Sequence, residues 1–298
     1  MNGSEQTVYG IQALEIQHEF GKKKVLNGVT LRISKGEIFG LLGPSGAGKT
    51  TLIKILTGQL APTGGQVITA GENGYCTGGK PGRRTENGRM RQCRIGIMMD
   101  EFGVYERLTC YENLKLFARI YGLPRHRIDS ALEQVGLTDA KKRAAMHLSK
   151  GMRSRLILAR ALMAEPDILF LDEPVSGLDP ATAEEIHRLL RVQQQRGVTI
   201  FLTTHNMSEA QNLCGNIALL HEGRIVEQGS PEEICRRYDH QRRIRLHLCD
   251  GRDVELANGA SSAGEVAGYL EREMVRTIHS TEPDLESVFM ELTGRGLD

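Results

Sequence analysis

The sequence contains no apolar run of the roughly 18 residues that a membrane-spanning helix requires. Its first ten residues, MNGSEQTVYG, also lack the apolar core of a secretory signal peptide. No CxxC pair occurs among the six cysteines, which we interpret as reduced structural thiols. These absences predict a chain that is soluble and intracellular on its own.

An excess of charge of either sign is missing as well, because 38 Lys and Arg residues face 37 Asp and Glu residues. The chain as a whole therefore gives no reason to expect nucleic acid as a partner. Basic clusters occur at residues 22–24, 141–143 and 236–245, and we interpret them as solvated faces rather than binding patches. With 298 residues, the chain is long enough for a main domain of about 200 residues and an appendage.

Short apolar segments bounded by Gly, Lys and Asn predict strands at residues 11–16, 25–33, 37–42 and 65–69. Residues 70–92 are rich in Gly, Arg and Asn and predict a long loop. Helices are predicted at residues 108–122, 128–137 and 150–165. The first of them opens with Thr109 and Glu112 in capping-box spacing.

From residue 167 onwards, apolar strand patterns alternate with helical patterns. The predicted order is a strand at 167–172, a helix at 182–195, a strand at 198–205, a helix at 207–213 and strands within 216–229. Such alternation implies a parallel sheet with helices on its faces. Residues 236–298 are more polar, and we expect a small mixed appendage with a hairpin at 243–256.

The segment GPSGAGKT fits the phosphate-binding pattern G-x-x-x-x-G-K-[ST] at all eight positions. It follows a predicted strand and opens a helix, which a glycine-rich turn without function would match only by accident. Backbone N–H groups and the helix N-terminus would face phosphate oxygens, with Lys49 reaching the outer phosphates and the Thr50 hydroxyl binding Mg²⁺. The predicted nucleotide-binding residues here are Gly43, Pro44, Ser45, Gly46, Ala47, Gly48, Lys49, Thr50 and Thr51.

Two apolar segments end in a pair of acids, RIGIMMDEFG at Asp100 and DILFLDEPVSG at Asp172 and Glu173. We assign the chemistry to the second pair. Asp172 is predicted to hold Mg²⁺ through water, and Glu173 to orient and polarise an attacking water. A structural ion pair with nearby basic residues is the alternative.

The motifs LSKGM (148–152), LFLDEPVSGLDP and TTHNMSEA follow the phosphate loop in an order that resembles ATP-binding cassette (ABC) ATPases. The resemblance covers about residues 10–230. It implies a P-loop α/β core with a mainly parallel sheet, an N-terminal antiparallel β subdomain and an inserted helical subdomain at about 101–165. The ABC domain would span residues 1–235, followed by a small α+β appendage at 236–298. The tail TEPDLESVFMELTGRG resembles the end of drug- or bacteriocin-type exporter subunits.

The family pairs two ATPase subunits head to tail, so ATP lies between the P-loop of one and the signature LSKGM of the other. The resemblance implies that Ser149 bonds the γ-phosphate and that Gly151 keeps the backbone close. Lys150 replaces a family glycine and either adds positive charge near the partner's phosphates or faces solvent. Asp179 would communicate between the two sites.

His205 would contact the γ-phosphate and maintain the geometry of the water near Glu173, although a lone histidine is more often structural. Phe20 lies where the family stacks an aromatic ring on adenine, with Val25 nearby, although an isolated Phe is more often in the core. Asp100 replaces the family's Q-loop glutamine. It is either a metal-sensing contact linked to the segment EFGVYERLT, which would touch the transporter, or a residue that caps the strand end.

The resemblance predicts an ATP- and Mg²⁺-dependent ATPase that powers transport, with export favoured and import left open. Its partners would be a second ABC subunit, identical or a sibling, and an integral-membrane permease that holds it on the inner face of the cell membrane. A non-transport ABC ATPase acting as an ATP-switched interaction module is the alternative. The long coiled coils or second cassette usual in that class are not seen, and LSKGM and TTHNM disfavour a P-loop kinase or GTPase.

Overall fold

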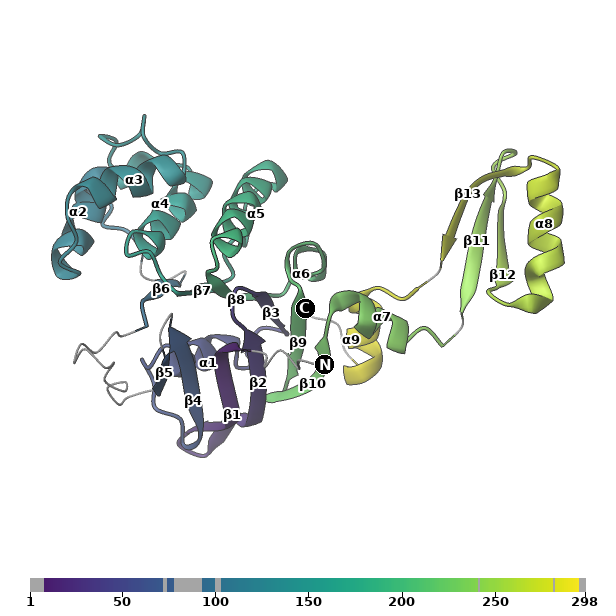
Figure 1. Cartoon of the computed structure of the whole chain (residues 1–298), viewed down its shortest axis with the longest axis horizontal. Helices are drawn as coiled ribbons and strands as arrows, with labels where there is room; N and C mark the ends of the chain where they lie inside the picture. Colours follow the sequence, from purple (N-terminus) through teal and green to yellow (C-terminus); the bar gives the residue numbers. More distant parts are fainter. Residues whose placement is uncertain are drawn as a thin grey trace, which may run out of the picture. The chain divides into compact units, whose positions relative to one another are not determined.

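The computed structural model describes residues 8–71, 74–77, 93–99, 103–240, 242–280 and 282–294. The chain divides between Gln228 and Gly229 into two compact units (Figure 1). The sequence suggested a boundary after residue 235. Helix α7 (Pro231–Arg237) instead belongs to the second unit, because it packs on α9 (Leu285–Thr293).

An antiparallel sheet with the strand order β2-β1-β4-β5 begins the first unit. Its strands are β1 (Tyr9–Phe20), β2 (Lys23–Ser34), β4 (Gly64–Gly71) and β5 (Gly74–Thr77). The prediction of a loop over residues 70–92 was wrong at its start, because β4 continues to Gly71 and β5 pairs with it. Backbone pairing satisfies N–H and C=O groups whatever the side chains are, so a segment poor in apolar residues extends this sheet.

The central sheet has the strand order β10-β9-β3-β8-β7-β6. Its strands are β3 (Ile38–Leu42), β6 (Ile95–Met98), β7 (Ile168–Asp172), β8 (Thr199–Thr204), β9 (Asn216–His221) and β10 (Arg224–Gly229). The pairs β9–β3, β3–β8, β8–β7 and β7–β6 are parallel, which confirms the predicted α/β class. Since parallel strands end at one edge of a sheet, the segments that follow β3, β7 and β8 meet there.

A shared apolar core joins the two sheets to helix α1 (Lys49–Leu56). Phe39 and Phe201 stack with ring centroids 6.0 Å apart, and Phe170 lies 5.7 Å from Phe201. Each of these rings contributes about 1.5–3 kcal/mol by its burial. Strands β3 and β8 are buried at every position and β7 at all but its last, so the central strands that carry the candidate site are packed on both faces.

Three helices, α2 (Cys110–Ile120), α3 (His126–Gln134) and α4 (Lys150–Leu162), pack together within the first unit (Figure 1). The predicted capping box opens α2, since Thr109 Oγ1 accepts from the Glu112 N–H at 3.2 Å and Glu112 Oε2 accepts from the Thr109 N–H at 2.9 Å. A 3₁₀ helix, η1 (Ala145–His147), precedes α4. Helices α5 (Pro180–Gln195) and α6 (Met207–Leu213) both pack against β8.

The second unit contains a three-stranded antiparallel sheet with the order β12-β11-β13. Its elements besides α7 and α9 are β11 (Arg243–Leu248), β12 (Asp253–Ala257), the 3₁₀ helix η2 (Ala260–Ser262), α8 (Ala263–Glu271) and β13 (Val275–Ser280). The predicted hairpin at 243–256 is confirmed by the β11–β12 pairing. In neither unit is a described helix long and apolar enough to cross a membrane.

Candidate active site

The phosphate-binding loop, residues 43–50, runs from the end of β3 into α1 and contains glycines that no other residue could replace. Gly48 has a φ of +111°, and a Cβ built on it would lie 2.8 Å from Leu26 Cδ2. A Cβ on Gly43 would collide with the carbonyl oxygen of Leu220 on β9. These two positions require glycine, the first for its backbone conformation and the second for close packing.

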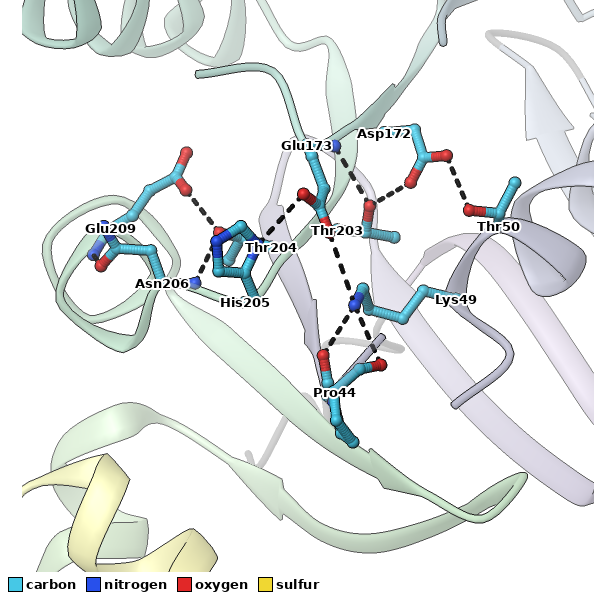
Figure 2. Close-up of polar contacts among 11 residues, drawn as sticks. Pro44, Lys49, Thr50, Asp172, Glu173, Thr203, Thr204, His205, Asn206 and Glu209 are labelled. Carbon is cyan, nitrogen blue, oxygen red and sulfur yellow. Dashed lines mark hydrogen bonds and ion pairs between the residues drawn. The ribbon is translucent and has the colours of Figure 1, made fainter. Parts of the chain in front are cut away.

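Lys49 turns its ammonium group back over this loop, where the side chain is only 7% exposed. Its Nζ donates to the carbonyl oxygens of Gly43 at 2.6 Å and Pro44 at 3.2 Å (Figure 2). The same Nζ lies 3.5 Å from Glu173 Oε1. A buried ammonium is costly unless it is paired and hydrogen-bonded, and these three oxygen atoms meet that need.

Asp172, the last residue of β7, is held between two threonine hydroxyls (Figure 2). Thr50 Oγ1 donates to its Oδ2 at 2.8 Å, and Thr203 Oγ1 donates to its Oδ1 at 2.5 Å. Thr203 stands opposite Asp172 in the register of the β7–β8 pair. The sheet register therefore fixes the carboxylate beside the first turn of α1.

Glu173 follows Asp172 in a left-handed backbone conformation, with a φ of +48°. For a residue with a side chain this conformation costs about 1–2 kcal/mol. The backbone N–H of Glu173 donates to two oxygen atoms of Thr203, the carbonyl oxygen at 3.1 Å and Oγ1 at 3.2 Å. These hydrogen bonds stabilise the turn. Glu173 Oε2 lies 3.0 Å from His205 Nδ1, so the Nδ1–H of His205 donates to the ionised carboxylate. The strained turn thus points Glu173 at both Lys49 and His205.

Ser149 caps helix α4, since its Oγ accepts from the Met152 N–H at 3.2 Å. A Cβ on Gly151 would lie 2.5 Å from Thr182 Cγ2 at the start of α5, so glycine is required for this close approach. The exposed Lys150 side chain places its Nζ against Gly177. Among the described residues, no hydrogen bond or ion pair joins the segment 149–151 to the phosphate-binding loop of the same chain.

Asp179 caps helix α5 through Thr182, whose N–H and hydroxyl donate to its carboxylate at 3.0 and 2.7 Å. These two hydrogen bonds hold the pKa of Asp179 below its usual value. The side chain is fully exposed, so the effect concerns its charge state rather than stability. Asp179 therefore presents a negative charge next to the segment that Lys150 contacts.

Comparison with known proteins assigns the chain to a family. The family model described as ABC transporter matches residues 26–176, which is more than half of the chain. The chain belongs to the ABC transporter family. A fluoroquinolones export ATP-binding protein of Mycobacterium tuberculosis is 38% identical over 295 residues, covering 97% of this chain and 94% of that protein. As an ABC ATP-binding subunit, the chain hydrolyses ATP to power transport.

Two further relatives agree with this assignment. A bacitracin transport ATP-binding protein of Enterococcus faecalis is 32% identical over 312 residues, covering 97% of each chain. The solved dimer of an ATP-binding cassette bound to ADP and Pi, in a post-hydrolysis state, is 26% identical with a TM-score of 0.62. That match covers 74% of this chain and 98% of the solved one. Nucleotide binding is therefore a property of this ABC domain.

The predicted adenine-stacking residue, Phe20, lies at the end of β1 with 54% of its surface exposed. Its ring meets His18 edge-on at 4.6 Å. Such exposure does not fit a core residue, which was the alternative interpretation. Val25 lies beside the P-loop, with its carbonyl oxygen 3.1 Å from a Cβ built on Gly48. Asp100, the remaining candidate, lies outside the described residues.

Sequence reasoning missed four polar residues that surround these groups, namely Thr203, Thr204, Asn206 and Glu209. Thr203 fixes Asp172, and the other three form hydrogen bonds around His205 (Figure 2). The sequence signal was present in the threonines of TIFLTTH, since β8 is buried at all six positions and its threonines need internal partners. That Asp172 is the partner of Thr203 depends on the strand order, which the sequence does not state.

Thr50 and Asp172 place two oxygen atoms next to one another, and oxygen is what Mg²⁺ prefers. Within the described residues, no cluster of three or more His, Cys, Asp or Glu side chains could hold a metal ion. This limited set fits Mg²⁺, which is commonly held by one or two protein oxygens together with substrate phosphates. The ion would therefore enter with the nucleotide.

Proposed function

We propose that this chain powers the export of a small antibiotic-like compound through a separate membrane permease. The main observation behind the proposal is the convergence of Lys49, Asp172, Glu173 and His205 at one edge of the central sheet. The export direction and the cargo class draw on the relatives, one of which is named for fluoroquinolone export and matches nearly the whole chain. The chain would sit on the inner face of the membrane through its permease.

In this proposal, Lys49 exchanges its contact with Glu173 for the outer phosphates of ATP. Thr50 and Asp172 would hold Mg²⁺, which would supply positive charge to neutralise the phosphate oxygens. The released Glu173 carboxylate accepts a hydrogen bond from the attacking water and polarises it. His205 keeps that carboxylate in place through Nδ1 and orients it toward the γ-phosphate.

A second subunit completes the site. The capped N-terminus of α4 at Ser149 is suited to bind the γ-phosphate of the partner's ATP, because its N–H groups and helix dipole favour an anion. Lys150 was expected either to add positive charge near the partner's phosphates or to face solvent. In the single chain its ammonium lies against Gly177. A phosphate held in the partner's P-loop would draw that ammonium away from Gly177 and across the interface. Asp179, which lies two residues after Gly177 and caps helix α5, would transmit this movement to that helix.

The permease would dock in a cavity of about 930 Å³ that lies along α2, α4 and β6. Tyr105, Phe117 and Tyr121 line it together with Arg160, whose guanidinium stacks 4.7 Å above the Phe117 ring. Arg160 also donates to the Gly103 carbonyl oxygen at 3.1 Å, and burial lowers its pKa from the usual value. A mostly apolar cavity with a fixed cation suits a short helix that carries one acidic or carbonyl-rich end.

Phe117→Ala tests this docking surface. Loss of the ring removes the platform for Arg160, so we expect permease-stimulated ATP hydrolysis to fall by about tenfold while the basal rate of the isolated chain stays the same. Ile120→Ala, on the same helix at a residue that is 65% exposed and does not line the cavity, is the control. Equal loss in both variants, or no loss in Phe117→Ala, would place the permease elsewhere.

Asp172→Asn tests the proposed metal site. The amide removes the negative charge but keeps the shape, so we expect the Mg²⁺ concentration for half-maximal hydrolysis to rise by about 10–100-fold. Binding of ATP in EDTA should be unchanged, because Lys49 and the loop backbone are intact. The control is Asp167→Asn, at the opposite end of β7, where the carboxylate bonds Arg94. A metal requirement that stays at its original value in Asp172→Asn contradicts the assignment.

Inside-out vesicles that carry this chain and the polytopic membrane protein that co-purifies with it test the function as a whole. We expect accumulation of a fluorescent fluoroquinolone or a labelled cyclic peptide antibiotic that requires MgATP and is abolished by Lys49→Ala. ATP-dependent loss of compound from the vesicles would instead indicate import. If no membrane protein co-purifies, the chain acts as an interaction module and the proposal fails.

A further inference from the structure

Two ionisable residues outside the proposed ATP site are buried together behind His205. His187 on α5 and Glu209 on α6 have side chains that are 10% and 4% exposed. His187 Nε2 lies 3.3 Å from Glu209 Oε1. Both residues line a cavity of about 600 Å³ that is also lined by Glu173 and His205. A buried carboxylate is expensive to maintain, so its position calls for an explanation.

Glu209 forms hydrogen bonds with Thr204 and Asn206, the residues before and after His205 (Figure 2). The Thr204 hydroxyl donates to Glu209 Oε2 at 2.6 Å, and the same Thr204 Oγ1 accepts from the Asn206 N–H at 2.9 Å. Asn206 Oδ1 in turn accepts from the Glu209 N–H at 3.0 Å. The Glu209 carboxylate therefore holds the Thr204 hydroxyl, which in turn holds the backbone N–H of Asn206, and the peptide groups of His205 lie between these two residues.

Helix α5 is joined to helix α6 by two contacts, the first of which is the pair His187 and Glu209. His187 lies eight residues after Asp179, which corresponds to about 12 Å along the helix axis. A second contact, from Arg191 Nη2 to the Asn212 carbonyl oxygen at 3.2 Å, also joins α5 to the end of α6. The helix that begins at Asp179 is therefore attached to the segment that carries His205.

We propose that Glu209 and His187 are positioning residues that hold His205 over Glu173 and make its position depend on helix α5. The inference rests on the proposed role of His205 in ATP hydrolysis. Glu209 restrains the backbone of residues 204–206, and His187 keeps Glu209 in place by donating from Nε2 to the ionised carboxylate. Neither residue touches the phosphate-binding loop, so both act through His205. A shift of α5 at its Asp179 end would thus move the His205 side chain as well.

Glu209→Ala in the full chain is expected to lower kcat for ATP hydrolysis by about tenfold, with KM for MgATP changed by less than about twofold. The predicted cause is a loosened His205, since the phosphate-binding loop is untouched. Glu209→Gln should restore most of the rate, because its carbonyl oxygen still accepts from Thr204 and its amide donates to a His187 in the other tautomer. Glu185→Gln, on helix α5 at an exposed carboxylate that pairs with Arg155, is the control and should have the original rate.

The decisive measurement repeats Glu209→Ala in a His205→Ala background. If Glu209 acts through His205, the double variant has the kcat of His205→Ala alone. Equal fold losses in both backgrounds would show that Glu209 affects the rate independently, and would overturn the inference while leaving the role of His205 intact. A His205→Ala variant with the original kcat would instead remove the proposed role of His205, and the inference with it.

Thr204→Val provides a second route in case Glu209→Ala fails to fold. Valine keeps the shape of threonine but cannot join Glu209 to the Asn206 N–H, so kcat should again fall by about tenfold. Thr204→Ser, which retains the hydroxyl, should recover the rate. An unaltered kcat in Thr204→Val, with ATP binding and thermal unfolding midpoint preserved, would contradict the inference.

Discussion

Glu173→Gln is expected to lower the rate of ATP hydrolysis on the order of 10²–10⁴-fold without weakening ATP binding. Glutamine has the shape of glutamate, and its carbonyl oxygen still accepts from His205 Nδ1, which lies 3.0 Å from the carboxylate. It lacks the charge that polarises water. It also lacks the charge that holds Lys49, whose Nζ is 3.5 Å from Glu173 Oε1, so the lysine is freer to bind phosphate.

Three measurements check this prediction, namely phosphate release at saturating MgATP, equilibrium ATP binding and size-exclusion chromatography with ATP present. Because unhydrolysed ATP would stay between the P-loop of one subunit and the signature of the other, the variant should elute as an ATP-bound dimer while the unmodified chain does not. Glu106→Gln, which removes an exposed carboxylate that pairs with Arg153, is the matched control. Turnover at the original rate in Glu173→Gln would exclude Glu173 as the water-polarising group.

The sequence was sufficient to predict the groups that meet at the edge of the central sheet. Asp172 ends β7, His205 follows β8, and Lys49 follows β3, and each lies at the carboxyl end of an apolar strand. In a parallel sheet such ends share an edge, so motif order and strand polarity together predict the site. The capping box of α2 and the β11–β12 hairpin were predictable for a similar reason, because each depends only on residues close in sequence.

Contacts between distant segments could not be predicted in the same way. Thr203 bonds Asp172 because β7 and β8 are neighbours in a particular register, and a shift of one residue would turn its hydroxyl away. The pairing of His187 with Glu209 depends on how α5 and α6 pack on β8. Neither residue stands out in the sequence, where a histidine within a helix and a glutamate near a helix start are common.

Lys150 illustrates a different limit. The sequence left two environments open for it, the partner's phosphates or solvent. The structure shows an exposed side chain whose ammonium lies against Gly177, a glycine with a φ of +63° where any Cβ would meet that ammonium. Residue 177 lies 27 positions from Lys150, so the sequence around the lysine could not show this contact. Strand β5 was missed for the related reason that its partner, β4, positions it.

Lys49→Ala is expected to weaken ATP binding by about 100-fold, since a charge-assisted contact contributes about 1.5–3 kcal/mol and the lysine is proposed to bind more than one phosphate oxygen. The loss of the ammonium has a second effect. Glu173 would keep its negative charge without its partner, and would repel the γ-phosphate from the same site. The variant Lys49→Ala with Glu173→Gln should therefore bind ATP more tightly than Lys49→Ala alone.

Calorimetric titration with MgATP separates these two effects when the single and double variants are compared. Lys54→Ala is the control, because it removes the same charge from the last turn of α1 without touching the phosphate-binding loop. Lys54 lies near a helix C-terminus, where a cation contributes about 0.3–1 kcal/mol to stability. The control should therefore have a slightly lower thermal unfolding midpoint and an unchanged affinity for ATP. An affinity for ATP that falls equally in Lys49→Ala and Lys54→Ala would show that net charge, rather than the ammonium above Gly43 and Pro44, attracts the nucleotide.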